Sequence, residues 1–347
     1  MKSPAIPAQL SGLILLAGVL SSCRSIPAPS AHDAGIPPPV IRFILSFDDG
    51  PSITKPYNPT LAILHQLATN DVQPGAKALF FVQTGHPRGG GTPEGHAVMR
   101  ALAAEEHLLG IHSVSPRGHV DHRKVPPAEL EAGLKAAQAL LRDITGSDPV
   151  FVRPPFGAKN QTTQALYEAL GLHMLMADIR ARDGLIYGYK GSLFRRIHIR
   201  NALIEIFQNA RHSGSPAASL TVILNFHDVN PYTARHMTDY LHILVDEARR
   251  VGFTVPDKPF FDGPQALKEA GLCRCIACPT SSTTSVAAAH SPLDPLRHAP
   301  YSMPPYAFHD PDIIVPDVAL GEPLSGQLRQ HAHSAPRRPV NPESIQR

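Results

Sequence analysis

The chain lacks the features that mark several large classes of protein. It has only four cysteines in 347 residues, too few for a fold held together by disulfide bonds. It has no apolar run that approaches the ~20 residues of a membrane-spanning helix. Its 32 basic and 29 acidic residues leave a net charge of +3, with no long block of like charges. We therefore exclude a disulfide scaffold, an integral transporter and a nucleic-acid-binding module.

The N-terminus has the pattern of a secretory leader. Lys2 supplies a positive charge, and a short apolar stretch follows over residues 10–20. The small residues before Cys23 resemble the lipobox of bacterial lipoproteins, in which the peptide is cut before a cysteine that then carries lipid. We expect a signal peptide over 1–22, a lipid on Cys23 and an extended proline-rich tether over 23–40, so that the protein is anchored to a membrane outside the cytoplasm. An ordinary secretory signal with an incidental cysteine is the alternative.

Residues 41–270 alternate short apolar runs with longer helical ones. The predicted strands are 41–47, 78–82, 108–111, 150–152, 174–176 and 220–224. The predicted helices are 59–67, 94–107, 127–145, 161–170 and 235–251. Apolar strands that alternate with helices are typical of a parallel sheet covered by helices. We predict an α/β fold, a (β/α) barrel or a reduced version of one.

The C-terminal region has a different composition. Residues 271–347 are rich in proline, serine, alanine and histidine without sustained periodicity, which predicts a disordered tail. The region begins with three cysteines, Cys273, Cys275 and Cys278. One local disulfide with a thiol left over is one interpretation of this cluster. A metal site completed by His290 or His298 is the other, although the spacing is not a standard one for zinc.

Polar residues follow the predicted strands. Asp48 and Asp49 stand where the first strand meets a Gly-Pro turn, and active sites form at the carboxyl ends of parallel strands. Two adjacent carboxylates repel, so a metal ion on one and an arginine near the other would separate their roles; capping of a turn is the alternative. Further polar residues after the other strands are His112, His119, His122, Arg153, Asp178, Asp183, His227 and Asp228. We expect these groups to converge on one face of the sheet.

The order of these motifs resembles that of the NodB-type polysaccharide deacetylases, carbohydrate esterase family 4, over about residues 40–265. The matching motifs are Ser46-Phe47-Asp48-Asp49-Gly50-Pro51, His112-Ser113, Arg153-Pro154-Pro155-Phe156-Gly157, Asp183 and Asn225-Phe226-His227. The resemblance implies a deacetylase domain over 41–270 with the distorted, incomplete barrel of that family. The resemblance further implies that the protein is a metal-dependent hydrolase.

The resemblance also implies catalytic roles for the matched residues. Asp48 is the expected general base, and Arg153 steadies it. His227 is the expected general acid, oriented by the carboxylate of Asp183. The backbone N–H of Phe156 helps to hold the oxyanion of the tetrahedral intermediate.

The expected metal ligands include one departure from the family. Asp49 and His112 match ligands, but the position of the second histidine, four residues after the first, is Pro116 here. We expect His119 to replace it if the residues after Pro116 form a small loop, with His122 as the alternative. One carboxylate and two neutral imidazoles suit Zn²⁺, with Co²⁺ or Ni²⁺ also possible, and the metal would activate water.

Two further departures concern the pocket for the acyl group. Gly184 stands where the family has tryptophan, and Asn225 where it has leucine. Both family residues wall the pocket that holds the acetyl methyl group, so we expect a roomier and more polar pocket.

The leading hypothesis for function is removal of N-acetyl groups from an amino-sugar polymer of the cell envelope, peptidoglycan or a related glycan. The same metal chemistry on a sugar O-ester or a non-sugar amide is the second hypothesis. A degenerate lipoprotein that binds glycan without turnover is the third.

Overall fold

The computed structural model describes residues 37–185, 191–212 and 219–275. The predicted signal peptide, Cys23, Cys278 and most of the predicted tether and tail lie outside the described residues. The chain divides into two units, residues 1–301 and 302–347, and the second lies entirely outside the described part. In the described ranges, no helix has the length and apolar character needed to cross a membrane.

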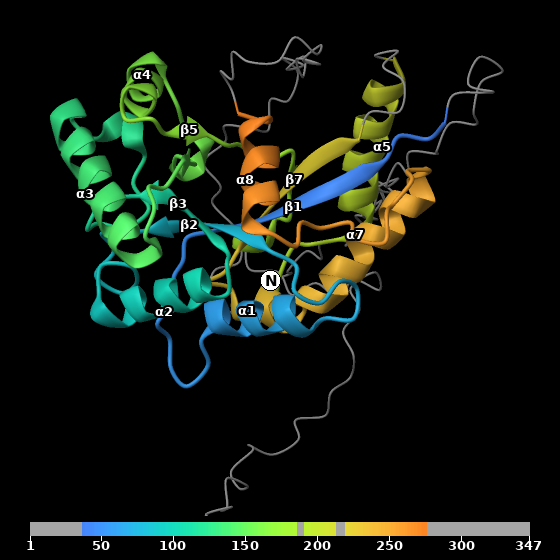
Figure 1. Cartoon of the computed structure of the whole chain (residues 1–347), viewed down its shortest axis with the longest axis horizontal. Coiled ribbons are helices and arrows are strands. Elements are labelled where there is room, and N and C mark those ends of the chain that lie inside the picture. Colours follow the sequence, from blue (N-terminus) through green and yellow to red (C-terminus); the bar gives the residue numbers. More distant parts are fainter. Residues whose placement is uncertain (1–36, 186–190, 213–218, 276–347) are drawn as a thin grey trace, which may run out of the picture. The chain divides into compact units, whose positions relative to one another are not determined.

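Seven parallel strands form one sheet in the order β5-β4-β3-β2-β1-β7-β6 (Figure 1). Their bounds are β1 Ile41–Asp48, β2 Ala78–Gln83, β3 Leu108–Ser113, β4 Phe151–Val152, β5 His173–Met174, β6 Ile179–Arg180 and β7 Leu220–His227. The outermost strands of this order, β5 and β6, each pair with one neighbour only, so the sheet does not close. The predicted incomplete barrel is confirmed.

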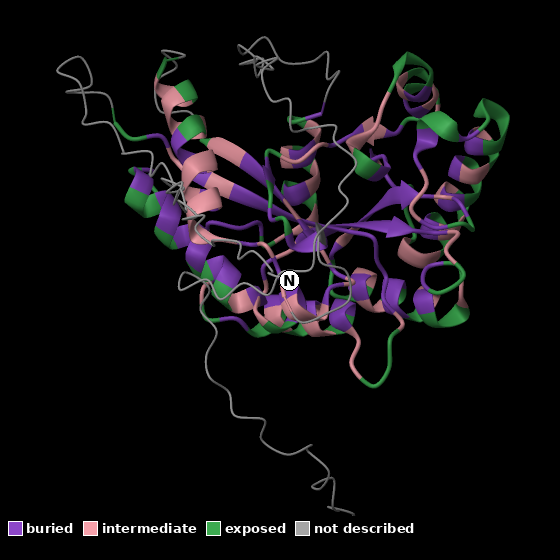
Figure 2. Cartoon of the chain, turned by 180° about the vertical axis from the view of Figure 1, so that it is seen from behind, coloured by how far each residue is buried: buried purple, intermediate pink, exposed green. Residues whose placement is uncertain are grey.

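Eight α-helices accompany the sheet in the described residues. Their bounds are α1 Pro59–Thr69, α2 Pro93–Ala104, α3 Pro127–Thr145, α4 Gln161–Ala169, α5 Arg196–His212, α6 Pro231–Arg235, α7 Met237–Val251 and α8 Pro264–Leu272. Neighbouring helices contact one another in the order α4, α3, α2, α1, α7, α5. Most strand residues are buried, although half of β7 is of intermediate burial, and the exposed residues lie mainly on the helices and loops (Figure 2).

The alternation of side chains along β1 divides the core in two. Phe43 and Leu45 belong to the larger apolar cluster, together with the buried faces of α1, α3 and α7. Ile44 points to the other face, into a smaller cluster that includes Leu267 of α8. Asp48 follows Ile44 at an even spacing, so it lies on the face that α8 partly covers.

Side-chain caps explain where several helices begin. The side chain of Asn58 accepts a backbone N–H at the start of α1, and Thr92 does the same for α2. Asn160 and Thr163 form a reciprocal capping box at α4, and Asn230 caps α6. These caps satisfy backbone donors that have no partner inside the helix.

The predicted elements are largely present, but four were missed. The pattern did not predict α5, α6, α8 or the two-residue strand β6, and the predicted helix 235–251 corresponds to α7, which begins at Met237. In α5, Arg196 and Arg200 face the protein and bind Glu247 of α7. Charged residues on the inner face weaken the apolar periodicity by which an amphipathic helix is identified.

Candidate active site

Three side chains converge at the carboxyl ends of the strands: one from the residue after β1, one from β3 and one from the loop after β3. The ligand atoms of Asp49, His112 and His119 all lie within 4.8 Å of one another. The Nε2 atoms of His112 and His119 are 3.0 Å apart, and they lie 3.3 Å and 3.5 Å from Oδ1 of Asp49. In the part of the chain that the structure describes, no other group of three such side chains meets this geometry. Two imidazoles and a carboxylate arranged in this way form a site for a divalent metal.

The loop after β3 returns His119 to the site. The N–H of Gly118 donates to the carbonyl of Ser115 (3.0 Å), and Oγ of Ser113 donates to the carbonyl of Gly118 (2.5 Å). Gly118 has a φ of 84°, which glycine adopts without steric cost. The small loop expected after Pro116 is therefore present.

Neighbouring groups place the protons of the ligand side chains. Nδ1 of His112 lies 2.7 Å from the carbonyl of Arg153, so Nδ1 carries the proton and Nε2 is left as the ligand atom. Burial lowers the pKa of His119 and favours its neutral form. Burial raises the pKa of Asp49, but a hydrogen bond from protonated His112 and the positive charges of protonated histidines outweigh burial and lower it. Burial lowers the pKa of His112, but the negative charges of Asp48 and Asp49 outweigh burial and raise it. Because a metal binds a carboxylate and a neutral imidazole, metal binding would release the Nε2 proton of His112.

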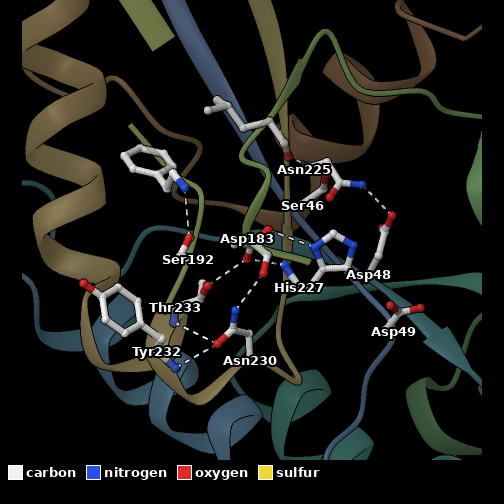
Figure 3. A network of polar contacts seen from close by, with 12 residues as sticks. Ser46, Asp48, Asp49, Asp183, Ser192, Asn225, His227, Asn230, Tyr232 and Thr233 are labelled. Carbon is white, nitrogen blue, oxygen red and sulfur yellow. Dashed lines mark hydrogen bonds and ion pairs between the residues drawn. The ribbon is translucent and has the colours of Figure 1, made fainter. Parts of the chain in front are cut away.

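Asp48 lies beside the metal site and is held at both carboxylate oxygens. Nη1 of Arg153 donates to Oδ1 (2.9 Å). Nδ2 of Asn225 donates to Oδ2 (2.5 Å), a contact drawn in Figure 3. Arg153 is buried, donates Nε–H to the carbonyl of Leu175 and lies over the ring of Phe81. The guanidinium of Arg153 therefore holds the Asp48 carboxylate by a charge-assisted hydrogen bond.

His227 and Asp183 form an ion pair on the other side of Asp48 (Figure 3). Oδ1 of Asp183 lies 2.9 Å from Nδ1 of His227, and Oδ2 accepts the backbone N–H of His227 and the hydroxyl of Thr233. Asn230 donates to the backbone carbonyl of Asp183 (2.8 Å). Burial opposes protonation of His227, but the charge of Asp183 and its hydrogen bond outweigh it and raise the pKa of His227 to about 9. His227 therefore carries a proton at neutral pH.

Phe156 lies in a turn after β4, within a short 3₁₀ segment, Pro155–Gly157. Its φ is 62°, and its backbone N–H donates no hydrogen bond within the described residues. Its side chain is 64% exposed, and its ring centroid lies 4.2 Å from that of His119. A free N–H in the turn next to a metal ligand is available to a developing oxyanion.

Comparison with known proteins agrees with this geometry. Residues 36–175 match the family model described as polysaccharide deacetylase. The chain is similar to a chitin deacetylase of Pestalotiopsis sp, with 27% identity over 248 residues that cover 72% of this chain and 70% of the relative. Over the matched residues, the chain has the sequence of a polysaccharide deacetylase, carbohydrate esterase family 4. The deacetylase is a metal-dependent hydrolase, and Asp49, His112 and His119 form its divalent metal site.

Two further similarities complete the comparison. A peptidoglycan-N-acetylglucosamine deacetylase of Listeria monocytogenes is 27% identical over 186 residues, which are 53% of the deacetylase described here but only 36% of the relative. The solved structure of the chitin deacetylase from Colletotrichum lindemuthianum has 21% sequence identity and a TM-score of 0.46. The match covers 66% of this chain and 94% of that one.

Gln83, the last residue of β2, is a site residue that sequence analysis missed. Its Nε2 donates to both the backbone carbonyl and Oδ1 of Asp49, at 3.1 Å each. Gln83 is buried, and its Oε1 accepts no hydrogen bond within the described residues. Its position at the end of a predicted strand is the one sequence signal that could have identified it.

The two departures in the acyl pocket contact the two residues expected to transfer protons. Asn225 donates to Asp48, as described above. At Gly184 a Cβ would lie 2.4 Å from Cε1 and 2.5 Å from Nδ1 of His227, so the backbone of Gly184 lies directly against the imidazole. That position has no room for a side chain unless His227 moves. The expectation of a roomier, more polar pocket stays a prediction.

Three polar residues that we expected near the site have other partners. Nδ1 of His122 lies 2.7 Å from the hydroxyl of Tyr167, so the alternative ligand assignment is wrong in this structure. Asp178 accepts a backbone N–H of β7. Asp228 accepts the hydroxyl of Thr60, and its burial raises its pKa to about 7. These residues connect elements of the fold and lie outside the group of metal ligands.

The cysteine cluster is described only in part. Cys273 is exposed, and Cys275 is buried with its Sγ 3.3 Å from the carbonyl of Gly271. Cys278 lies outside the described residues. Within the described ranges, neither cysteine belongs to a group of three potential metal ligands.

Proposed function

We propose that the deacetylase removes N-acetyl groups from an amino-sugar polymer of the cell envelope, with Asp48 as general base and His227 as general acid. The observation that carries the proposal is the register of β1 and β7, in which Asp48 pairs with His227. This register places a carboxylate and a protonated imidazole side by side next to the metal site. Amide hydrolysis needs this pair, because one group must remove a proton and the other must supply one.

The metal ligands fit Zn²⁺, with Co²⁺ or Ni²⁺ as alternatives. Bound by Asp49, His112 and His119, a divalent metal would supply a Lewis acid that polarises the acyl carbonyl and lowers the pKa of water. The set leaves positions open for water and substrate. The side chains around the metal site carry out the remaining steps of the reaction.

In the proposed reaction, Asp48 acts first by accepting a proton, and His227 acts last by donating one. Asp48 removes a proton from the water that attacks the acyl carbonyl, and Arg153 holds Asp48 in place. The backbone N–H of Phe156 donates to the oxyanion; such a donor typically contributes about 3 kcal/mol to transition-state stabilisation. His227 then donates its proton to the amine nitrogen as the carbon–nitrogen bond breaks. The products are acetate and a free amino sugar.

Two independent lines support an envelope glycan as the substrate. One relative is named for chitin and another for peptidoglycan N-acetylglucosamine, so both names point to a polymer of an N-acetylated amino sugar. The predicted signal peptide and the lipid on Cys23 would hold the deacetylase at a membrane outside the cytoplasm, next to peptidoglycan.

The purified full-length chain, loaded with Zn²⁺, tests the proposal on chitin oligomers, peptidoglycan and acetylated xylan. We expect acetate and free amines from an amino-sugar polymer. We expect Asp48→Asn to lose turnover while it retains one metal ion per chain, because Asp48 is not a ligand. Acetate release from acetylated xylan and from no other substrate would favour the O-ester hypothesis. One bound metal without acetate release from any substrate would favour the glycan-binding hypothesis.

A separate experiment tests the anchor. We expect the full-length chain expressed in a bacterium to incorporate radiolabelled fatty acid and to sediment with membranes. Cys23→Ser should lose both properties, whereas Cys273→Ser should keep them. Secretion of an unlabelled wild-type chain would contradict the lipid and favour an ordinary signal peptide.

A further inference from the structure

We propose that Asn225 is a positioning residue that fixes the carboxylate of Asp48 for proton abstraction. The inference rests on the proposed function, in which Asp48 is the base. No motif that identifies the family requires an amide at this position, and from the sequence we expected Asn225 only to line the acyl pocket.

The two oxygens of Asp48 have donors from two different elements. Arg153, which directly follows β4, occupies Oδ1 (2.9 Å), and Asn225 of β7 occupies Oδ2 (2.5 Å). Arg153 Nη1 also donates to the hydroxyl of Ser46 (2.8 Å), and that hydroxyl donates to the carbonyl of Leu224. The base therefore lies in a hydrogen-bonded network that connects β1, β7 and the residue after β4. Figure 3 shows the part of this network that joins Asp48 to Asn225.

The backbone of Asn225 is fixed from both sides. In the sheet it pairs with Ser46 of β1 and with Arg180 of β6, and its carbonyl accepts the N–H of Ala181 (2.9 Å). His227 lies two residues further along the same strand, hence on the same face. A donor on such a strand has a well-defined position, which is the condition for holding a reactive group in one geometry.

The second donor changes what Asp48 can do. A carboxylate held at one oxygen can still turn about its Cβ–Cγ bond, whereas donors to both oxygens fix its plane. The amide is neutral, so it orients the carboxylate without a second positive charge. Each oxygen keeps a lone pair beyond the bond that it makes, and Oδ2 can still accept a proton from water. Orienting the reacting groups beforehand reduces the entropy lost in the transition state.

The test compares Asn225→Leu with the wild-type chain on the substrate that the wild type hydrolyses. Leucine keeps the approximate size of asparagine and removes the donor. We expect kcat to fall about 10- to 100-fold, the usual effect of removing a hydrogen-bonding partner of an active-site group. KM, Tm and Zn²⁺ affinity should stay close to wild type, because Asn225 donates to Asp48 and not to a metal ligand. Thr221→Val, half-buried on the same strand, is the matched control and should leave kcat unchanged.

A double-mutant cycle separates positioning from packing. In the Asp48→Asn background, Asn225→Leu should cause no further loss of the residual rate, since Asn225 acts through Asp48. An unchanged kcat in Asn225→Leu, or an equal loss in both backgrounds, would overturn the inference. An inactive wild-type chain would instead refute the proposed function, so the two failures are distinguishable.

Discussion

At the scale of single residues, the positions of protons depend on the neighbours of each ionisable group. Asp183 has no exposed surface and receives hydrogen bonds from His227 and Thr233. This carboxylate outweighs the effect of burial on His227, whose pKa rises to about 9. Because the folded-state pKa lies above the ordinary value of 6.5, His227 keeps its proton until the pH rises through about 9.

Replacement of Asp183 by asparagine should therefore change the pH dependence of turnover. Without the charge, the effect of burial remains and lowers the pKa of His227. We expect the alkaline limb of kcat/KM in Asp183→Asn to lie at least about one pH unit below that of the wild type. The control is Asp239→Asn, which removes an exposed carboxylate 3.0 Å from His236. Alkaline limbs that coincide in Asp183→Asn and the wild type would contradict the assignment of His227 as the acid.

Gly184 is a second residue at which the addition of one carbon atom should change turnover. A methyl group there would lie 2.4 Å from Cε1 of His227, so Gly184→Ala must displace the imidazole. We expect kcat to fall at least about tenfold with metal content unchanged. Gly263→Ala is the control, because a Cβ at Gly263 meets nothing within 4 Å. Full activity in Gly184→Ala would show that His227 need not occupy this position during the reaction.

At the scale of elements, the carboxyl ends of the strands collect the reactive groups. Asp48 ends β1, Gln83 ends β2, and His227 ends β7, while Arg153 follows β4 directly. Parallel strands bring these ends to one edge, although the residues are far apart in sequence. The helices outside the sheet hold that edge in place.

The contact between α5 and α7 depends on one buried carboxylate. The side chain of Glu247 is fully buried and binds Arg200 (2.6 Å) and Arg196 (3.2 Å) of α5. Glu247→Gln should lower the free energy of unfolding by roughly 3 kcal/mol, because it removes one partner of a buried ion pair. Urea unfolding measures this loss, with Glu131→Gln as the control. Glu131 forms an exposed pair with Lys135, so its loss should be below about 0.5 kcal/mol. Equal losses in the two variants would refute the role of Glu247.

At the scale of the whole molecule, the metal site joins separate parts of the chain. Asp49 follows β1, His112 lies in β3, and His119 lies in the loop after it. A metal bound by all three binds the folded state and not the unfolded one, so it adds stability to the entire domain.

Removal of the metal should lower the Tm of the wild-type chain. At a free metal concentration of 100 times Kd, the loss corresponds to about 2.7 kcal/mol. For His119→Ala, the Tm should be almost the same in chelator as in Zn²⁺. For His122→Ala, the difference in Tm between the two conditions should equal that of the wild type, whatever the Tm of the variant itself. Thermal unfolding with and without chelator provides the measurement. The reverse pattern would identify His122 as the ligand.

Several properties of the fold followed from local patterns. The apolar run over 41–47 predicted a buried strand, and the helical pattern over 127–145 predicted a helix; the structure has both. The incomplete barrel and the family were confirmed as well. Helices α5, α6 and α8 were missed. Helix α5 carries charges on its inner face, which weaken its apolar periodicity, and α6 has only five residues.

The types of reactive side chain and their places at strand ends could be predicted from the chain alone, because both are properties of short segments. The choice between His119 and His122 needed the folded structure, since it depends on where the loop after Ser113 turns back. The contact of Asn225 with Asp48 joins residues 177 positions apart, and that of Gln83 with Asp49 joins residues 34 apart. Such contacts depend on strand order and register, which arise from the packing of the entire sheet and from no local pattern.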